Sequence, residues 1–323
     1  MIMTLICAGM GNQMFMYAAG LASASRLNTE LVLNNSYFRS YFRTKKGIPY
    51  QLSHFPEITE RTALLRDVWK LSPGLAVRNV ITSRPIRKYH VFRYILLKAI
   101  IRLNLAPIDY SNMWNIKYAK HPENIPFPYA YKFSRICNEN FAHKDRFREI
   151  PDDTLLVGFW ESEDYFDGYA DDVRKKFRFA EDCFDPALTS RVRQCNSVAV
   201  HVRRGDKLRE GEKAYSNMSY LRHALEAVSS RTDSPEFFVF SDDITWCKEN
   251  LHKAHEAKYH FVEGQTAPQD MALMTQCKHV IMGPSTFSWW GAWLNENPRK
   301  LIIAPKNHRP NTGWHIRGAV LVD

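Results

Sequence analysis

The sequence predicts an α/β protein with two domains, and three observations support this prediction. The chain has 323 residues, about twice the length of a typical domain. Apolar residues make up 45% and charged residues 24%, which is the balance of a folded globular protein. Short apolar runs alternate with stretches of helical periodicity, and this alternation indicates a parallel sheet flanked by helices.

The alternation is clearest in the second half of the chain, where it predicts a Rossmann-like, nucleotide-binding layout. The predicted strands are Ser197–Val202, Phe237–Ser241, Tyr259–Val262, His279–Met282 and Lys300–Ala304. The predicted helices between them are Met218–Ser230, Ile244–Leu251, Gln269–Cys277 and Phe287–Leu294.

The first half is less regular but also predicts an α/β domain. Its predicted elements are strand Leu5–Ala8, a turn at Gly9–Gln13, helix Met14–Leu27, strand Leu31–Leu33 and strand Leu155–Trp160. We expect the boundary near Asp185–Cys195, which gives domains of residues 1–190 and 191–323.

The charge of the chain favours an anionic partner. The formal net charge is +10, which suits a nucleic acid, a phosphate-bearing small molecule or an acidic membrane surface. Between Val68 and Ile108 there are eight basic residues and no acidic ones. This block predicts weak peripheral contact with an anionic membrane, although the basic face of a soluble domain explains it equally well.

The cysteines and the N-terminus predict a cytoplasmic protein. The six cysteines form no CxxC pair, which argues against a zinc site and a disulfide scaffold. The apolar N-terminus lacks the basic region of a signal peptide, and no apolar run is long enough to cross a membrane. The sequence has no DxD triplet and its His residues are scattered, so we expect no bound metal and no cofactor.

Candidate site residues follow the predicted strands, because ligands of such sheets bind beyond the carboxyl ends of the strands. Since side chains alternate along a strand, His201 and Arg203 should point to one side and Arg204 to the other. The guanidinium of Arg203 keeps its charge and matches phosphate oxygens, so it suits a diphosphate. A surface salt-bridge cluster with Asp206 is an equally good explanation of these residues.

Two further strand ends carry polar residues. The Ser285–Ser288 turn opens a helix, whose N–H groups and hydroxyls form a phosphate cradle, although ordinary N-capping explains Ser285 or Thr286 as well. Asp242 and Asp243 can accept hydrogen bonds from guanine or can cap the next helix. We expect the tryptophans that follow Phe287 to be packing residues, and Asp270 to be a helix cap.

The first domain contributes uncharged and aromatic candidates. Asn12 and Gln13, in the Gly-rich turn, can recognise sugar hydroxyls. Trp160 and Glu161 lie in an aromatic and acidic stretch that can stack on a sugar or serve as packing.

Taken together, these segments resemble the bacterial α-1,2-fucosyltransferases of glycosyltransferase family 11. The similarity is carried by Gly9–Phe15, Gly158–Phe166, His201–Asp206, Ser241–Asn250 and Asp270–Leu294. It implies a GT-B type fold of two Rossmann-like domains facing across a cleft, with residues 1–190 on the acceptor side and 191–323 binding the donor. It also implies GDP-β-L-fucose as the donor, inversion at the anomeric carbon, no metal, and a galactose-terminated oligosaccharide or lipid-linked glycan as the acceptor.

The resemblance also implies roles for individual residues. Arg203 would bind the β-phosphate, and His201 and Asp242 or Asp243 would face the nucleoside. Ser285–Ser288 would hold phosphate and ribose, and Asn12 and Gln13 would face the transferring sugar. The candidate catalytic residues are Arg203, Asp206 and Asn12. The candidate donor-binding residues are His201, Arg203, Asp242, Asp243, Ser285, Thr286, Phe287 and Ser288. The candidate acceptor-binding residues are Gln13, Trp160 and Glu161.

Two other functions explain parts of the sequence. A glycosyltransferase for another nucleotide sugar would keep the same fold and motifs. A basic membrane-surface or RNA-binding protein would explain the charge but would not need polar motifs at successive strand ends, and no aromatic RNA-recognition motif is present. We therefore expect no nucleic acid partner.

Overall fold

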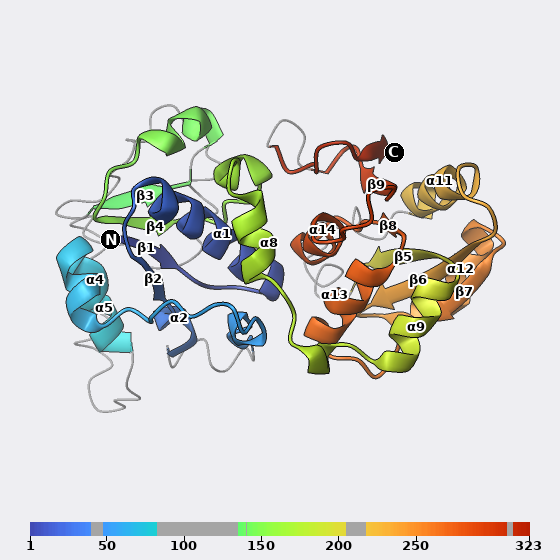
Figure 1. Ribbon diagram of the computed structural model, residues 1–323, viewed down its shortest axis with the longest axis horizontal. Helices are drawn as coiled ribbons and strands as arrows, with labels where there is room; N and C mark the ends of the chain where they lie inside the picture. Colours follow the sequence, from blue (N-terminus) through green and yellow to red (C-terminus); the bar gives the residue numbers. More distant parts are fainter. Residues whose placement is uncertain (40–47, 83–134, 140, 205–217, 309–312) are drawn as a thin grey trace. The chain divides into compact units, whose positions relative to one another are not determined.

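The computed structural model describes residues 1–39, 48–82, 135–139, 141–204, 218–308 and 313–323. It divides into two compact units, each built on a parallel sheet (Figure 1). Unit 1 comprises Met1–Ser53 and Glu57–Lys176, and unit 2 comprises His54–Pro56 and Phe177–Asp323. Two Rossmann-like α/β units are the components of a GT-B type chain, so the predicted fold class is confirmed at this level.

The sheet of unit 1 has the strand order β2-β1-β4-β3, and all its neighbouring strands are parallel. Its strands are β1 (Ile2–Leu5), β2 (Leu31–Asn34), β3 (Ile136–Asn138) and β4 (Thr154–Val157). Its α-helices are α1 (Met10–Arg26), α2 (Ser36–Arg39), α4 (Leu65–Leu71), α5 (Pro73–Thr82) and α8 (Ala170–Lys176). Its 3₁₀ segments are η1 (Leu52–His54), η4 (Phe141–Glu149) and η5 (Glu163–Phe166). Every residue of β1, β2 and β4 is buried, as expected for apolar strands covered on both faces.

Helix α1 begins earlier than the sequence predicts. Gly9 has an extended backbone (φ −73°, ψ 169°) and serves as the N-cap, so the helix starts at Met10 instead of after a longer turn. Fourteen of its seventeen residues are buried, and the Thr4 hydroxyl of β1 donates to the Met16 carbonyl at 3.0 Å. This packing fixes the turn that joins β1 to α1.

The sheet of unit 2 has the strand order β10-β9-β8-β5-β6-β7, again with parallel neighbours. Its strands are β5 (Asn196–Val202), β6 (Pro235–Ser241), β7 (Lys258–Phe261), β8 (His279–Ile281), β9 (Ile302–Pro305) and β10 (Val320–Val322). Its helices are η6 (Glu181–Cys183), α9 (Pro186–Gln194), α11 (Met218–Ser229), α12 (Ile244–Ala254), α13 (Ala267–Gln276) and α14 (Thr286–Trp293).

Alternation along β5 distributes its side chains between two helical layers. Val198, Val200 and Val202 join a buried apolar cluster with residues of α11 and α12. The intervening side chains point to the opposite face, where the ring of His201 lies 5.5 Å from that of Phe287 in α14. The functional candidates on β5 therefore face the layer that contains α14.

The boundary between the units differs from the predicted one at residue 190. The structure divides the chain after Lys176, because α9 packs in unit 2. Val192 of α9 is fully buried, and its carbonyl accepts a hydrogen bond from Ser197 of β5. The short segment around Phe55 also joins unit 2, where its ring lies 5.0 Å from that of Phe177.

None of the helices in the described part of the chain combines the length and the apolar character that a membrane crossing needs.

Candidate active site

The topology of unit 2 places a ligand crevice beside β5. From β5 the chain proceeds to β6 and β7 on one side, and then returns to β8, β9 and β10 on the other. Ligands of such sheets bind at this reversal, outside the carboxyl ends of the two central strands. These ends belong to β5 and β8, so the two predicted segments His201–Arg204 and Gly283–Ser288 meet there.

Gly283 allows these two segments to approach closely. A Cβ atom at this position would lie 2.7 Å from the His201 carbonyl oxygen and 2.9 Å from His201 Nδ1. Both contacts are shorter than side chains tolerate, and one of them is with backbone. Only glycine therefore fits at this point of the crevice.

Gly283→Ala is expected to destabilise the protein by about 1–3 kcal/mol, because the added methyl group overpacks the β5–β8 contact. Chemical denaturation measures this loss. Gly9→Ala is the control, since its Cβ would have no heavy atom within 4 Å, and we expect it to cost at most about 1 kcal/mol. Equal stability of the Gly283 variant and the wild type would contradict the close approach.

His201 is a buried, neutral imidazole at the crevice. The residue is only 6% exposed. Burial and the positive charge of Arg203 lower the pKa of its imidazole to about 4, whereas the negative charge of Asp242 acts in the opposite direction. Its Nδ1 has no hydrogen-bond partner among the described residues. A neutral imidazole can donate from one nitrogen and accept at the other, so His201 can bind a polar ligand group without adding charge.

The two neighbouring arginines differ in their surroundings. Arg203 Nε lies 3.3 Å from Asp242, and about a third of its side chain (35%) is exposed. Arg204 is only 12% exposed: its Nε lies 3.1 Å from Asp243, and its Cζ lies 3.8 Å from the centre of the Trp246 ring. Arg204 is thus held by packing, whereas Arg203 keeps exposed surface beyond the end of β5.

Asp242 and Asp243 organise this arginine pair. Asp242 accepts the Arg204 backbone N–H at 2.8 Å, and Asp243 caps α12 by accepting the Trp246 N–H at 3.2 Å. The capping interpretation therefore holds for Asp243. Asp206, a candidate catalytic residue, lies outside the described residues. A nucleoside contact of Asp242 stays a prediction.

The Ser285–Ser288 turn is held together by its own hydroxyls. Ser285 is the N-cap of α14 and accepts the Phe287 N–H at 3.2 Å. Ser288 is fully buried, and its hydroxyl donates a hydrogen bond to the Gly283 carbonyl at 2.9 Å. The predicted contact of Ser288 with the donor substrate is therefore not what this structure shows. What the turn presents at the crevice is the positive end of α14 at Thr286 and the half-buried Phe287 ring beside His201. The tryptophans that follow are buried, which confirms that they are packing residues.

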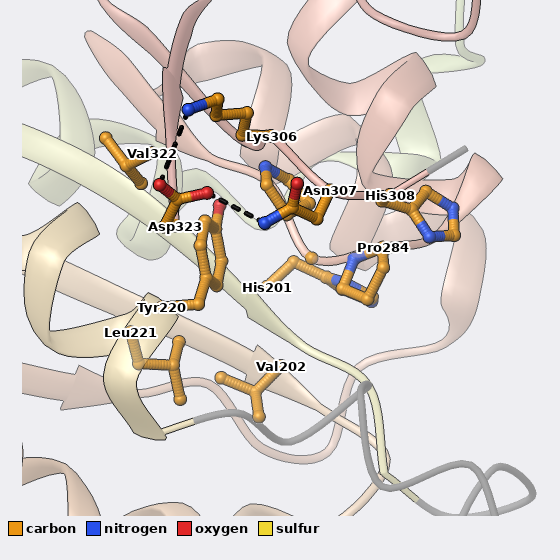
Figure 2. Close-up of a pocket in the computed structure, with 12 residues that line it drawn as sticks. His201, Val202, Tyr220, Leu221, Pro284, Lys306, Asn307, His308, Val322 and Asp323 are labelled. Carbon is orange, nitrogen blue, oxygen red and sulfur yellow. Dashed lines mark hydrogen bonds and ion pairs between the residues drawn. The ribbon is translucent and has the colours of Figure 1, made fainter. Parts of the chain in front are cut away.

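A cavity of about 140 Å³ adjoins the crevice and is lined by His201 and Pro284 (Figure 2). On its far wall, Asp323 accepts a hydrogen bond from Asn307 at 2.8 Å and pairs with Lys306 at 3.5 Å. These three residues were missed in the sequence analysis. Lys306 and Asn307 directly follow β9, so the rule of strand ends could have found them.

Asp270 is a further candidate residue at this edge of the sheet. It lies in the first turn of α13, which starts beyond the carboxyl end of β7 at the same edge of the sheet. Its Oδ1 atom is shut off from solvent and has no hydrogen-bond partner among the described residues. Burial raises its pKa to about 7. A buried carboxylate oxygen that lacks a partner is costly, so Asp270 is a candidate for a ligand-binding residue.

Unit 1 has a corresponding reversal between β1 and β4, which are neighbours in its sheet. Two residues that are not glycine adopt the left-handed backbone region three positions beyond the ends of these strands: Ala8 with φ 61° and Trp160 with φ 56°. This conformation is strained, above all for a bulky residue, and strain of this kind collects at functional edges. Because β1 and β4 are parallel neighbours, the segments that follow them and lead to Asn12 and Glu161 begin at the same edge of the sheet.

Gln13 does not face an acceptor as predicted. It is fully buried, its Nε2 donates to the carbonyls of Ala8 (2.8 Å) and Pro49 (3.0 Å), and its Oε1 accepts the Gln51 N–H at 2.8 Å. The amide is saturated by these bonds and fastens the segment before η1 to the β1–α1 turn. Its role is structural.

Trp160 and Glu161 are also buried, being 1% and 2% exposed. The Trp160 ring packs 4.9 Å from Phe147 and 5.2 Å from Tyr165, so it cannot stack on an acceptor sugar in this structure. The aromatic character of this stretch reflects packing, the alternative that the sequence left open. Asn12 is half-buried in the first turn of α1, and its role stays a prediction.

The family model described as Glycosyl transferase family 11 matches residues 105–312, which is more than half of the chain. The chain belongs to glycosyl transferase family 11. This family 11 glycosyltransferase is 28% identical to an α-1,2-colitosyltransferase of Escherichia coli over 93% of the chain and 89% of the relative. It is 32% identical to galactoside α-(1,2)-fucosyltransferase 1 of Saimiri boliviensis boliviensis over 43% of the chain and 42% of the relative. Among solved structures, NodZ α-1,6-fucosyltransferase soaked with GDP-fucose is similar at 14% identity and a TM-score of 0.47, with 94% of each chain covered.

Proposed function

We propose that this family 11 glycosyltransferase transfers L-fucose from GDP-β-L-fucose to O2 of a terminal galactose, with inversion, giving an α-1,2 linkage. The observation that carries the proposal is the crevice between β5 and β8. There the permanently charged Arg203 follows the neutral His201 at the end of β5, and the first turn of α14 contacts His201 through the Phe287 ring. This combination suits a nucleoside diphosphate that leaves with increasing negative charge.

The chemistry follows from the charge that develops as the bond between the sugar and the phosphate breaks. Arg203 and the positive end of α14 stabilise the diphosphate as it leaves, and they are already in place before the reaction. Asp242 holds the Arg203 guanidinium at 3.3 Å and thus orients it. The fixed charge therefore favours the transition state over the bound substrate.

Asp270 supports a guanine nucleotide as the donor. A guanine base presents two donors on one edge, N1–H and the 2-amino group, and a carboxylate can accept both. Asp270 offers a half-buried carboxyl group whose Oδ1 atom is shut off from solvent and lacks a hydrogen-bond partner among the described residues. Binding of the base would supply the missing hydrogen bonds.

A second donor is favoured by one comparison. The Escherichia coli relative that aligns with 93% of the chain is named an α-1,2-colitosyltransferase. Colitose differs from L-fucose in lacking the 3-hydroxyl group. We therefore name colitosyl transfer as the second candidate. Both donors place the same GDP group in the crevice.

The test is transfer in vitro. The purified protein is incubated with GDP-fucose, GDP-colitose, GDP-mannose or UDP-galactose and a galactose-terminated oligosaccharide, and the product linkage is determined by NMR. We expect an α-1,2-fucosylated galactoside from GDP-fucose. Turnover with GDP-colitose alone would replace the first candidate by the second, and RNA binding without any transfer would contradict both.

We also propose that the reaction needs no metal, because Arg203 and the α14 N-terminus supply the positive charge. In the described part of the chain, no three His, Cys, Asp or Glu side chains gather as a metal site would require. Excess chelator is therefore expected to leave the transfer rate unchanged. Loss of activity on chelation, with recovery on adding Mn²⁺ or Mg²⁺, would contradict this prediction.

We further propose a cytoplasmic location, with lipid-linked glycans as acceptors and weak peripheral contact with the membrane. The supporting observation is the basic block between Val68 and Ile108, which suits an anionic lipid surface.

A further inference from the structure

Three large apolar side chains are exposed on α4 and its N-cap residue in unit 1. Leu64 is 50% exposed, Leu65 53% and Trp69 55%, and we call these three residues the α4 ridge. In the described part of the chain, the other large apolar residues exposed to a comparable degree are Ile48 and Leu321. Single exposed apolar residues are ordinary, but a contiguous group of them marks an interaction surface.

The ridge is held outward by the structure around it. Leu65 and Trp69 are one helical turn apart and so lie on the same face of α4. Asp67 accepts the Leu64 backbone N–H at 2.8 Å and is itself held by Arg61 at 2.6 Å. These bonds fix the first turn of the helix, and with it the direction of the ridge.

Charged residues on α4 are sorted by face. Arg66 and Lys70 are exposed next to Leu65 and Trp69, and the Lys70 side chain is 56% exposed although it pairs with Asp153. The acidic residue of the helix, Asp67, is buried and turned away from solvent. The outward face of α4 therefore combines apolar and basic side chains, which is the composition of a helix that lies on an anionic membrane.

We propose that the α4 ridge inserts into the interfacial layer of an anionic membrane, with Arg66 and Lys70 contacting lipid phosphates. Tryptophan rings favour this layer, and long basic side chains reach from it to the headgroups. The inference rests on the proposed function in one respect, because a lipid-linked acceptor would be met at such a surface. It assigns membrane contact to named residues of unit 1.

Vesicle flotation of the full chain tests the proposal. The wild type is expected to float with vesicles of phosphatidylethanolamine and phosphatidylglycerol and not with vesicles of phosphatidylcholine. The double variant L65Q/W69Q should partition at least about tenfold more weakly, because it removes the apolar insertion. R66Q/K70Q should bind the anionic vesicles roughly tenfold more weakly, since each basic residue contributes to the attraction by the lipid charge. Leu321→Gln, on β10 of unit 2, is the matched control and should float like the wild type.

Several results would overturn the proposal. One is that the wild type does not float with anionic vesicles. Another is that L65Q/W69Q floats as well as the wild type. A third is that the wild type binds no vesicles but is a dimer in analytical ultracentrifugation, whereas L65Q/W69Q is a monomer. That result would assign the ridge to contact with a second copy of the chain. Transfer to a soluble galactoside without vesicles is measured in parallel and should be the same in all variants. A wild type that floats but transfers no fucose would contradict the proposed function and leave the membrane surface standing.

Discussion

Arg203→Ala is expected to lower kcat by about 10²–10³-fold while the protein stays folded, because a preorganised donor at the diphosphate is lost. The side chain is partly exposed and its Nε pairs with Asp242 at 3.3 Å, so its removal leaves the core intact. The loss falls on kcat because the charge on the leaving diphosphate is largest in the transition state. Arg203→Lys should also be impaired, since an ammonium lacks the planar fork.

Arg204→Lys is the matched control for this prediction. Arg204 stacks on Trp246 and pairs with Asp243, so its replacement should cost about 1 kcal/mol of stability and leave kcat near that of the wild type. Steady-state kinetics on purified, folded variants decide the matter. If Arg203→Ala keeps more than about a tenth of wild-type kcat, a loss below ~1.4 kcal/mol, the assignment of Arg203 is wrong.

Asp270→Asn is expected to weaken GDP binding by about 10²-fold, because each hydrogen bond from guanine to a carboxylate is worth about 1.5–3 kcal/mol. The asparagine side chain keeps one acceptor oxygen, but its NH₂ group replaces the second one. This NH₂ group would face a hydrogen-bond donor of the guanine base and could not bond with it. Inosine diphosphate, which lacks the 2-amino group, sharpens the measurement. The wild type should prefer GDP to inosine diphosphate, and the variant should lose most of this preference in isothermal titration.

The same substitution is expected to stabilise the protein without ligand above pH 7. Burial raises the pKa of Asp270 from 3.8 to about 7, so ionising it costs the folded state on the order of 4 kcal/mol once the pH exceeds 7. This cost is absent below pH 4, where the carboxyl is protonated in both states, and it grows as the pH rises to 7. The melting temperature of Asp270→Asn should therefore exceed that of the wild type at pH 8 by more than at pH 5.

Asp242→Asn is the control, because we expect it to change the melting temperature in the opposite direction. Asp242 pairs with Arg203 and accepts the Arg204 N–H, so its replacement should lower the melting temperature. Unchanged GDP affinity of Asp270→Asn would refute the guanine contact. A lower melting temperature of that variant at pH 8 would show that the Asp270 carboxylate is stabilised in the folded protein.

The sequence by itself determined the elements whose signals are local. Strand β5 and helix α12 were predicted within a few residues of their bounds, because apolar periodicity and capping depend on neighbouring residues alone. The rule that ligands bind at strand ends then selected His201 and Arg203 before any strand order was known.

Only the tertiary structure decided which polar residues are available to a ligand. Gln13 had the composition of a sugar-binding residue, but its amide is used by Pro49 and Gln51, more than thirty positions away in the sequence. Asp270 was predicted as a cap, and its burial follows from how α13 packs in unit 2. The order of strands around β5 depends in the same way on pairing between distant segments. Local patterns specify elements, whereas the hydrogen-bond partner and solvent exposure of a polar group depend on contacts that the chain makes only when it is folded.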